Sequence, residues 1–313
     1  FQAEDGIRDC LLSRGLGDVY KRQYNVSMSE GFTKSGLSIP PIGLGTWDLQ
    51  GPTCSRIVRE ALELGYRHID GASMYENESE VGQGVIDSGV DREEIFITTK
   101  INTTSWTPSK GNGPSLQNKD IVKHFEQSLK DLQTDYVDLL LIHWPKFETN
   151  LADMLDILYK IKDAKKTKEV GVANFNSHLV NECINLGFND IYCNQIEYHP
   201  FLSQAKLMEV MQDFDLIPVA YCPICRGDVA RHDVLISLSN KYSKTPAQIA
   251  LRWLYQQRAV SIPKTANSHR LKENFDIFDF EIEYKDMLEI YSLERNQRLV
   301  PNLEINESKY PFD

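Results

Sequence analysis

Four side chains of this 313-residue sequence could together move a proton onto an oxygen atom: Asp70, Tyr75, Lys100 and His143. A tyrosine phenol is a poor acid at neutral pH, because its ordinary pKa is about 10, but a neighbouring ammonium stabilises the phenolate and lowers that pKa. Lys100 can supply the ammonium, and Asp70 can pair with it. His143 can orient a carbonyl oxygen by hydrogen bonding. The set suits the reduction of a carbonyl group, which also needs a hydride donor.

Each of these residues has an ordinary structural interpretation when it is taken alone. A strand-end aspartate often caps a turn or a helix, a lone lysine is usually a solvated charge, and a lone histidine can be a core residue. Their common placement favours chemistry, because Asp70, Lys100 and His143 each close a short apolar run and Tyr75 follows the first run. The elements that carry these runs must therefore bring their ends together.

Short β-branched runs alternate with longer segments of helical period from Ile39 onward, which indicates β–α units on a parallel sheet. The helical segments, such as 118–132 and 151–166, carry apolar residues at i, i+3, i+4 and i+7. Eight such units over about 250 residues are the size of a (β/α)8 barrel, whose strands present their carboxyl ends on one face. Strands are predicted within 40–47, 66–70, 95–101, 137–144, 170–175, 191–198, 217–223 and 259–265.

An open doubly wound sheet is the alternative fold, and it usually carries a G-x-G-x-x-G motif for a dinucleotide. "GLGTWD", which begins at Gly43, has Asp48 where the third glycine is needed. The sequence shows no internal repeat, linker-like composition or low-complexity tract. We therefore predict an α/β fold, a (β/α)8 TIM barrel, in a single domain over residues 24–313.

Residues 1–23 are excluded from this domain because they read as translated sequencing adapter. Asp18 to Gln23 back-translate as GAT GTG TAT AAG AGA CAG, a transposase end sequence, and residues 2–9 back-translate as a flow-cell adapter. A native disordered arm is the alternative. We expect this segment to be non-native and the protein to start at Met28.

Composition and charge exclude several classes of protein. The chain is 41% hydrophobic and 25% charged, and it has no apolar run long enough for a membrane span. Basic and acidic residues balance in 1–23, so the net charge of −11 belongs to the rest of the chain and disfavours a nucleic acid partner. Apart from Cys10 in the excluded segment, the cysteines are scattered and follow no export signal, which indicates reduced thiols in a cytoplasmic protein.

Metal and redox chemistry find little support in the sequence. The histidines show no H-x-H or H-E-x-x-H pairing, which disfavours a metal-dependent hydrolase, and we predict no metal. The C-x-x-C motif of Cys222 and Cys225 has no second pair to complete a zinc site, and alone it is weak evidence of redox chemistry. His199 is the strongest candidate for a further functional histidine, but for it we favour a structural hydrogen bond.

From about Ile39 to Phe312 the chain resembles the aldo-keto reductase family. The motifs "GLGTW", "GYRHIDGASMYENESEVG", "ITTKI", "LLLIHWP", "VGVANFN", "NQIEYHP" and "IPKTANSHRLKENF" follow the family's order and spacing. The resemblance implies NADPH-dependent reduction of an aldehyde or ketone to an alcohol by hydride transfer, with Tyr75 as proton donor. The alternative function is that of a non-enzymatic barrel, which an incomplete set of catalytic side chains would have favoured. The implied catalytic tetrad is Asp70, Tyr75, Lys100 and His143.

The resemblance also implies an extended NADPH across the barrel mouth. Asn174 and Gln195 would bind the nicotinamide carboxamide, and Tyr221 would stack under the ring. At Ala173 the family usually has serine, so the hydrogen bond of that serine to the carboxamide has no counterpart in this sequence. A loop and helix N-terminus after the last strand is a common phosphate site in barrels. The further implied cofactor contacts are Gly45, Thr46, Trp47 and Asp70, with Lys264, Thr265, Arg270, Glu273 and Asn274 at the adenosine end.

The substrate side is less determined. The 103–118 loop is longer than the family norm, and a lid and a tolerated insertion are equal alternatives for it. "RNQRLVPN" is similar to the microbial 2,5-diketo-D-gluconate and methylglyoxal reductase branch. We expect a monomer acting on a small-molecule carbonyl substrate, with no membrane partner; the physiological substrate and direction stay open. The implied substrate contacts are Trp47, Tyr75, Trp106, His143 and Trp144.

Overall fold

The computed structural model describes residues 31–103, 106–107, 109, 111–112, 116–145 and 150–300, with the backbone alone at 106–107 and 111–112. The predicted adapter segment 1–23 and the predicted start at Met28 lie outside the described residues.

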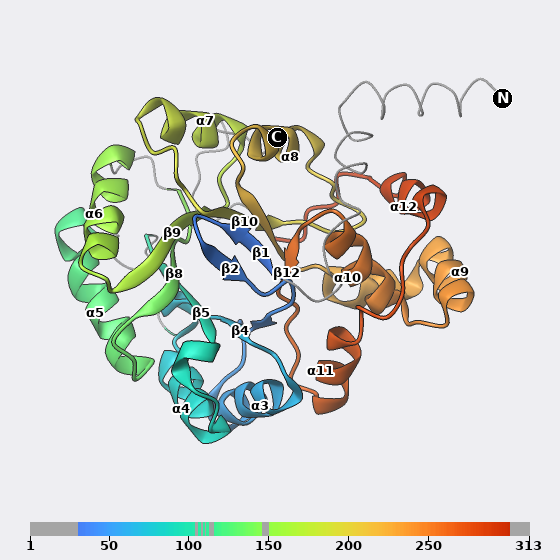
Figure 1. Cartoon of the computed structure of the whole chain (residues 1–313), viewed down its shortest axis with the longest axis horizontal. Helices are drawn as coiled ribbons and strands as arrows, with labels where there is room; N and C mark the ends of the chain where they lie inside the picture. Colours follow the sequence, from blue (N-terminus) through green and yellow to red (C-terminus); the bar gives the residue numbers. More distant parts are fainter. Residues whose placement is uncertain are drawn as a thin grey trace.

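An eight-stranded parallel sheet curls into a barrel (Figure 1), which confirms the predicted fold class. Parallel bridges of Ile42 with Ser261 and of Gly45 with Lys264 join the first and last strands, so the sheet closes and the open doubly wound alternative is wrong. The strands are β3 (Leu44–Gly45), β4 (His68–Asp70), β5 (Phe96–Ile101), β8 (Val137–Ile142), β9 (Thr167–Ala173), β10 (Cys193–Glu197), β11 (Ile217–Tyr221) and β12 (Val260–Ser261).

Helices surround the barrel (Figure 1), because each buries one apolar stripe against the sheet. In α3 the stripe is Cys54, Ile57, Val58, Ala61 and Leu62. No helix in the described ranges is long and apolar enough to cross a membrane. The helices are α3 (Gly51–Leu64), α4 (Glu78–Ser88), α5 (Ile121–Asp131), α6 (Leu151–Asp163), α7 (Ser177–Asn185), α8 (Ala205–Asp213), α9 (Asp233–Tyr242), α10 (Pro246–Gln256), α11 (Ser268–Phe275) and α12 (Tyr284–Tyr291).

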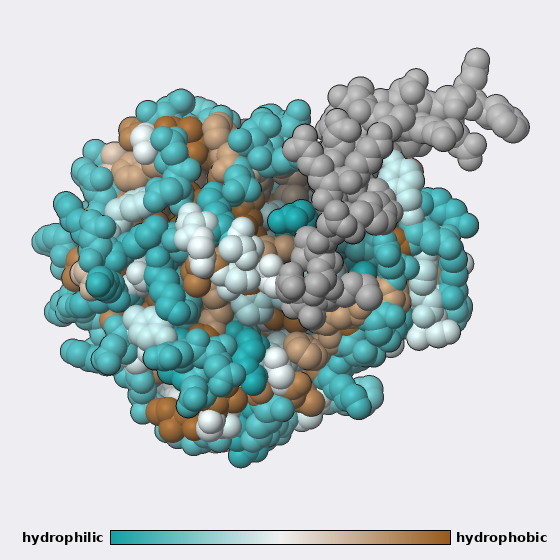
Figure 2. Space-filling model, in the orientation of Figure 1, coloured by the Kyte–Doolittle hydropathy of each residue, from teal (hydrophilic) through white to brown (hydrophobic). Residues whose placement is uncertain are grey.

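A hairpin of β1 (Phe32–Lys34) and β2 (Leu37–Ile39) lies across one end of the barrel (Figure 1). Lys34 Nζ donates to the carbonyls of Ile191 (2.8 Å) and Asp215 (2.7 Å), which precede β10 and β11. The hairpin therefore covers the amino-terminal end of the strands. Figure 2 shows this face, whose outer rim of helices is largely hydrophilic. The opposite mouth, at the carboxyl ends, remains for chemistry.

A buried carboxyl group joins α4 to the barrel wall. Glu78 is 6% exposed, and its Oε1 accepts a hydrogen bond from Thr99 Oγ1 (2.5 Å). Burial raises the pKa of Glu78 to about 7, and the hydrogen bonds of Thr99 and Ser128 oppose this shift only in part. The charged form of this side chain is therefore disfavoured in the folded protein.

This raised pKa predicts a pH-dependent stability that Glu78→Gln should remove. Between the ordinary pKa of 4.5 and about 7, the folded chain holds a proton on Glu78 that the unfolded chain releases. The free energy of unfolding should thus fall as pH rises through this window, by at most about 3 kcal/mol. Urea unfolding at about pH 5 and about pH 8 measures it. An equal pH dependence in wild type and variant would contradict the expectation.

Candidate active site

The structure brings the four predicted catalytic side chains to the open mouth of the barrel. Asp70 is the last residue of β4, Lys100 lies one residue before the end of β5, and His143 directly follows β8. Tyr75 ends the 3-10 helix η1 (Ser73–Tyr75), which begins three residues after β4. The parallel sheet places these strand ends side by side, which is why residues 70 and 143 can share one site.

Lys100 lies at the centre of the cluster. Its Nζ is 2.5 Å from Asp70 Oδ1, 2.9 Å from the Gly71 carbonyl and 3.2 Å from the phenol oxygen of Tyr75. The ring of His143 meets the Tyr75 ring edge-on, with centroids 5.6 Å apart. The Lys100 side chain is 0% exposed and Tyr75 is 9% exposed, so the phenol marks the boundary between the ion pair and the mouth.

Burial dominates the protonation states in this cluster. It raises the pKa of Tyr75, and the opposing effect of the Lys100 ammonium is smaller, so the expected net lowering of this pKa is wrong. Burial alone would lower the pKa of Lys100, but Asp70 and Tyr75 outweigh it and the pKa is raised. Burial and the charge of Lys100 hold the pKa of His143 well below its usual value. The site therefore combines a protonated phenol, an ammonium and a neutral imidazole.

A second layer of hydrogen bonds holds Asp70 and the turn beside it. Gln195 Nε2 donates to Asp70 Oδ2 (2.7 Å), and Thr46 Oγ1 donates to the Asp70 carbonyl (2.9 Å). Asn77 Nδ2 donates to the carbonyls of Thr46 and Leu49, at 2.8 Å each. Sequence reasoning missed Asn77, because its partners lie 31 and 28 residues away in the chain.

The three predicted nicotinamide residues lie beside the tetrad. Asn174 directly follows β9, and its φ of 63° is in the left-handed region that asparagine tolerates better than most residues. Its Nδ2 donates to the His143 carbonyl (2.8 Å), and its Oδ1 accepts from the Tyr221 phenol (2.7 Å). Gln195 lies in β10, and Tyr221 ends β11. Two amides and an aromatic ring therefore share one wall of the mouth.

The predicted phosphate residues lie around the start of α11. Lys264 and Arg270 are exposed, whereas Thr265 and Asn274 are buried and Glu273 is partly buried. Gly45 has a packing role here, since a Cβ at this position would lie 2.6 Å from the Ile262 carbonyl. The glycine thus allows β3 to approach the β12 end closely.

The structure adds one cation to this corner that the sequence did not suggest. Arg56, on α3, lies 3.3 Å from Ser268 Oγ and 3.5 Å from the Ala266 carbonyl. Glu60 accepts a hydrogen bond from the same Ser268 hydroxyl (2.5 Å) and pairs with Arg56. These contacts join residues about 210 positions apart, so no local pattern could have revealed them.

The predicted substrate contacts are less uniform. Trp47 is 41% exposed, and its ring centroid lies 5.0 Å from that of Tyr75. Trp144 is buried beside His143, with ring centroids 6.4 Å apart. The backbone of Trp106 lies in β6 (Trp106–Thr107), which pairs with β7 (Gly111–Asn112), but its side chain lies outside the described residues. The lid and insertion alternatives for this loop therefore stay open.

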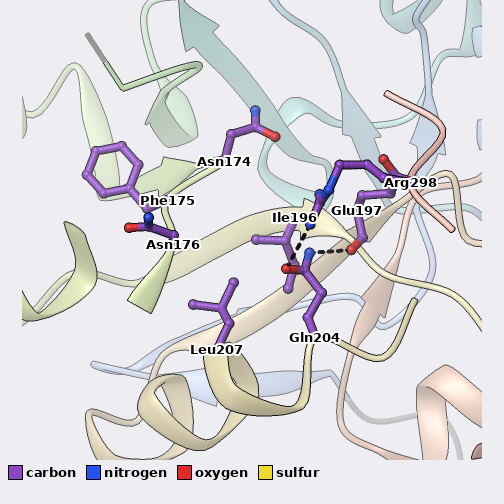
Figure 3. A pocket seen from close by; sticks show the side chains of 8 residues that line it. All are labelled: Asn174, Phe175, Asn176, Ile196, Glu197, Gln204, Leu207 and Arg298. Atoms are coloured by element: carbon purple, nitrogen blue, oxygen red, sulfur yellow. Dashed lines mark hydrogen bonds between the residues drawn. The ribbon is translucent and has the colours of Figure 1, made fainter. Parts of the chain in front are cut away.

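A small pocket lies next to this site rather than at the tetrad (Figure 3). It has about 200 Å³ of empty volume, open solvent included, and Asn174, Glu197, Gln204 and Arg298 are among the residues that line it. Gln204 donates to the Glu197 carbonyl (2.6 Å). The Glu197 side chain accepts from His199 Nε2 (2.9 Å), a structural contact of the kind favoured for that histidine. Since none of the tetrad lines this pocket, it is not the reaction centre.

Neither a disulfide nor a metal cluster marks another site in the part of the chain that the structure describes. The cysteines there are free thiols. Burial raises the pKa of Cys222 to about 11, so this thiol is less reactive than an ordinary one. In the same ranges, no group of three or more His, Cys, Asp or Glu side chains could hold a metal ion.

Comparisons with known proteins agree on one family. The sequence model described as "Aldo/keto reductase family" matches residues 41–295. An aldo-keto reductase of Mycolicibacterium smegmatis is 38% identical over 85% of this chain and 94% of its own length. The glyoxal reductase of Bacillus subtilis is 37% identical over 86% of this chain and 94% of its own length. A solved structure of a putative 2,5-diketo-D-gluconic acid reductase B superposes with a TM-score of 0.81 at 34% identity, over 90% of this chain and 96% of that one.

Proposed function

Because the chain belongs to the aldo/keto reductase family of carbonyl reductases, we propose that it reduces a small aldehyde or ketone to an alcohol with a hydride from NADPH. The observation that carries this proposal is the contact of Lys100 with both Asp70 and the Tyr75 phenol. A phenol bonded to a buried ammonium can give up its proton to an oxygen on which negative charge develops. The intact cluster and the basic corner at α11 argue against a non-enzymatic barrel.

The residues at the mouth suit the parts of NADPH. Asn174 and Gln195 offer amides for its carboxamide, Tyr221 offers a ring face for the nicotinamide, and Lys264 and Arg270 offer positive charge for its phosphates. When bound, NADPH would supply the hydride. Ala173 has no side-chain donor to add to these amides.

The chain's own part in the reaction is to orient the carbonyl group and to protonate it. The neutral imidazole of His143 donates a hydrogen bond to the carbonyl oxygen, and Tyr75 then transfers its phenol proton to that oxygen. Lys100 stabilises the phenolate left behind, and Asp70 keeps the ammonium in place. The edge-on contact of the His143 and Tyr75 rings supports this assignment, because two adjacent side chains can reach one carbonyl oxygen.

Cofactor consumption tests the reaction class. The purified protein should oxidise NADPH in the presence of aldehydes, keto acids or diketo sugars, and the names of the relatives make glyoxal and 2,5-diketo-D-gluconate sensible first compounds. Absence of turnover with every class, in a folded protein that binds NADPH, would contradict the proposal.

Arg270→Ala should weaken NADPH binding and leave NADH binding nearly unchanged. The exposed guanidinium at the start of α11 can grip the dianionic 2′-phosphate, which NADH lacks. Loss of charge-assisted bonds worth about 1.5–3 kcal/mol should raise the NADPH dissociation constant about tenfold to a hundredfold. Titration of the wild type and the variant with NADPH and with NADH measures these dissociation constants.

Lys272→Ala provides the matched control, because Lys272 is an exposed cation on the same helix that was not predicted to bind the cofactor. It should change NADPH affinity much less. Equal weakening of NADPH and NADH by Arg270→Ala would refute the phosphate role of Arg270.

A further inference from the structure

Asp48 and Lys264 form an ion pair across the seam where the barrel closes. Lys264 Nζ lies 3.4 Å from Asp48 Oδ2, and the two side chains are 35% and 74% exposed. Lys264 is one of the two cations that the proposed function assigns to the phosphates of NADPH, and the family resemblance places both at its adenosine end, which carries the 2′-phosphate. The carboxylate of Asp48 is therefore already paired with the ammonium that the phosphate would need.

A braced turn fixes the position of Asp48. Leu49 N donates to the Thr46 carbonyl (3.1 Å), and the buried amide of Asn77 donates to the carbonyls of both residues. Asp48 has a φ of 57°, so it sits in the left-handed region at the tip of this turn. Rotation of its side chain can move the carboxylate, but the bracing keeps its backbone next to the seam.

Lys264 is fixed on the other side of the same seam. Its backbone bridges that of Gly45, and Gly45 N donates to the Pro263 carbonyl (3.2 Å). Closure of the barrel thus keeps the two charges within reach of each other. A dianionic phosphate that approaches Lys264 competes with the Asp48 carboxylate for the ammonium and is repelled by that carboxylate.

We propose that Asp48 is a specificity-determining residue that limits the preference for NADPH by competing for Lys264. This inference rests on the proposed role of Lys264 and adds a residue that the family resemblance did not suggest. Exposed ion pairs contribute about 0.2–1 kcal/mol, so removal of the competing charge should tighten NADPH binding by at most about fivefold. NADH carries no 2′-phosphate, and its affinity should change by less than about twofold.

Asp48→Asn tests the proposal with little risk to the fold, because the side chain is largely exposed. Dissociation constants for NADPH and NADH are measured by titration of the protein with each cofactor at low and at high salt. NADPH should bind about two- to fivefold more tightly to the variant, and this gain should shrink at high salt, where exposed charges are screened.

Asp91→Asn is the matched control for net charge. Asp91 is exposed and precedes β5, so it lies toward the end of the barrel opposite the mouth. Its substitution should leave both constants unchanged. If Asp91→Asn tightens NADPH as much as Asp48→Asn does, or if Asp48→Asn has no effect on NADPH, the proposal is overturned.

A Lys264→Met background separates the two proposals. Lys264→Met alone should weaken NADPH binding, and Asp48→Asn should give no further gain when Lys264 is absent. If the gain persists without Lys264, Asp48 does not act through that cation and the inference is overturned. If Lys264→Met leaves NADPH affinity unchanged, the phosphate role of Lys264 is itself contradicted. If Lys264→Met weakens NADPH binding but Asp48→Asn has no effect in the otherwise wild-type protein, only the Asp48 inference fails.

Discussion

Tyr75→Phe is expected to lower kcat at least about a hundredfold while NADPH affinity stays within about twofold of wild type. The phenylalanine ring can keep the contacts with Trp47 and His143, whose centroids lie 5.0 Å and 5.6 Å from that of Tyr75. The substitution removes the oxygen that lies 3.2 Å from Lys100 Nζ. Only the proton donor is lost, so the defect should appear in turnover rather than in binding.

The measurement compares steady-state turnover, cofactor titration and melting temperature. Tyr159→Phe is the matched control, since Tyr159 lies on α6, away from the mouth, and the change removes a phenol hydroxyl that donates to Asp190. It should keep wild-type turnover. A folded Tyr75→Phe protein with turnover within about tenfold of wild type would show that another group delivers the proton.

Lys100→Met should both inactivate and destabilise the protein. The Lys100 and Asp70 side chains are 0% and 2% exposed, so the variant leaves a buried carboxyl group without its ammonium partner. Breaking a buried pair on one side costs about 3–5 kcal/mol. Burial already raises the pKa of Asp70, and without Lys100 this carboxyl should take up a proton, which limits the cost. The Tyr75 phenolate would also lose its stabilising charge.

A double variant separates stability from chemistry. Asp70→Asn with Lys100→Met removes both charges, and it should recover part of the stability lost in Lys100→Met while turnover stays at least about a hundredfold below wild type. Urea unfolding and turnover assays measure the two effects. Lys100→Met as stable as wild type, or recovered turnover in the double variant, would contradict this account of the pair.

The sequence determined the fold and identified Asp70, Tyr75, Lys100 and His143 as the candidates for one shared site. Hydrophobic period and strand spacing are local properties, so all eight strands can be located from the sequence alone. Because parallel strands of a barrel end at one face, Asp70, Lys100 and His143 could be predicted to meet although they are far apart in the chain. The basic residues after β12 were implied by the family resemblance, and their place at a predicted helix start agrees with the usual phosphate site of barrels.

Only the tertiary structure decided how these groups are held and charged. The bracing of the Thr46–Leu49 turn by Asn77, the approach of Arg56 to Ser268 and the pairing of Asp48 with Lys264 join segments between 28 and 216 residues apart. No hydrophobic pattern in the sequence predicts such contacts, because they form only when the barrel closes. The net pKa of Tyr75 has the same origin. Burial is a property of the whole fold, and here it outweighs the single charge that the sequence placed beside the phenol.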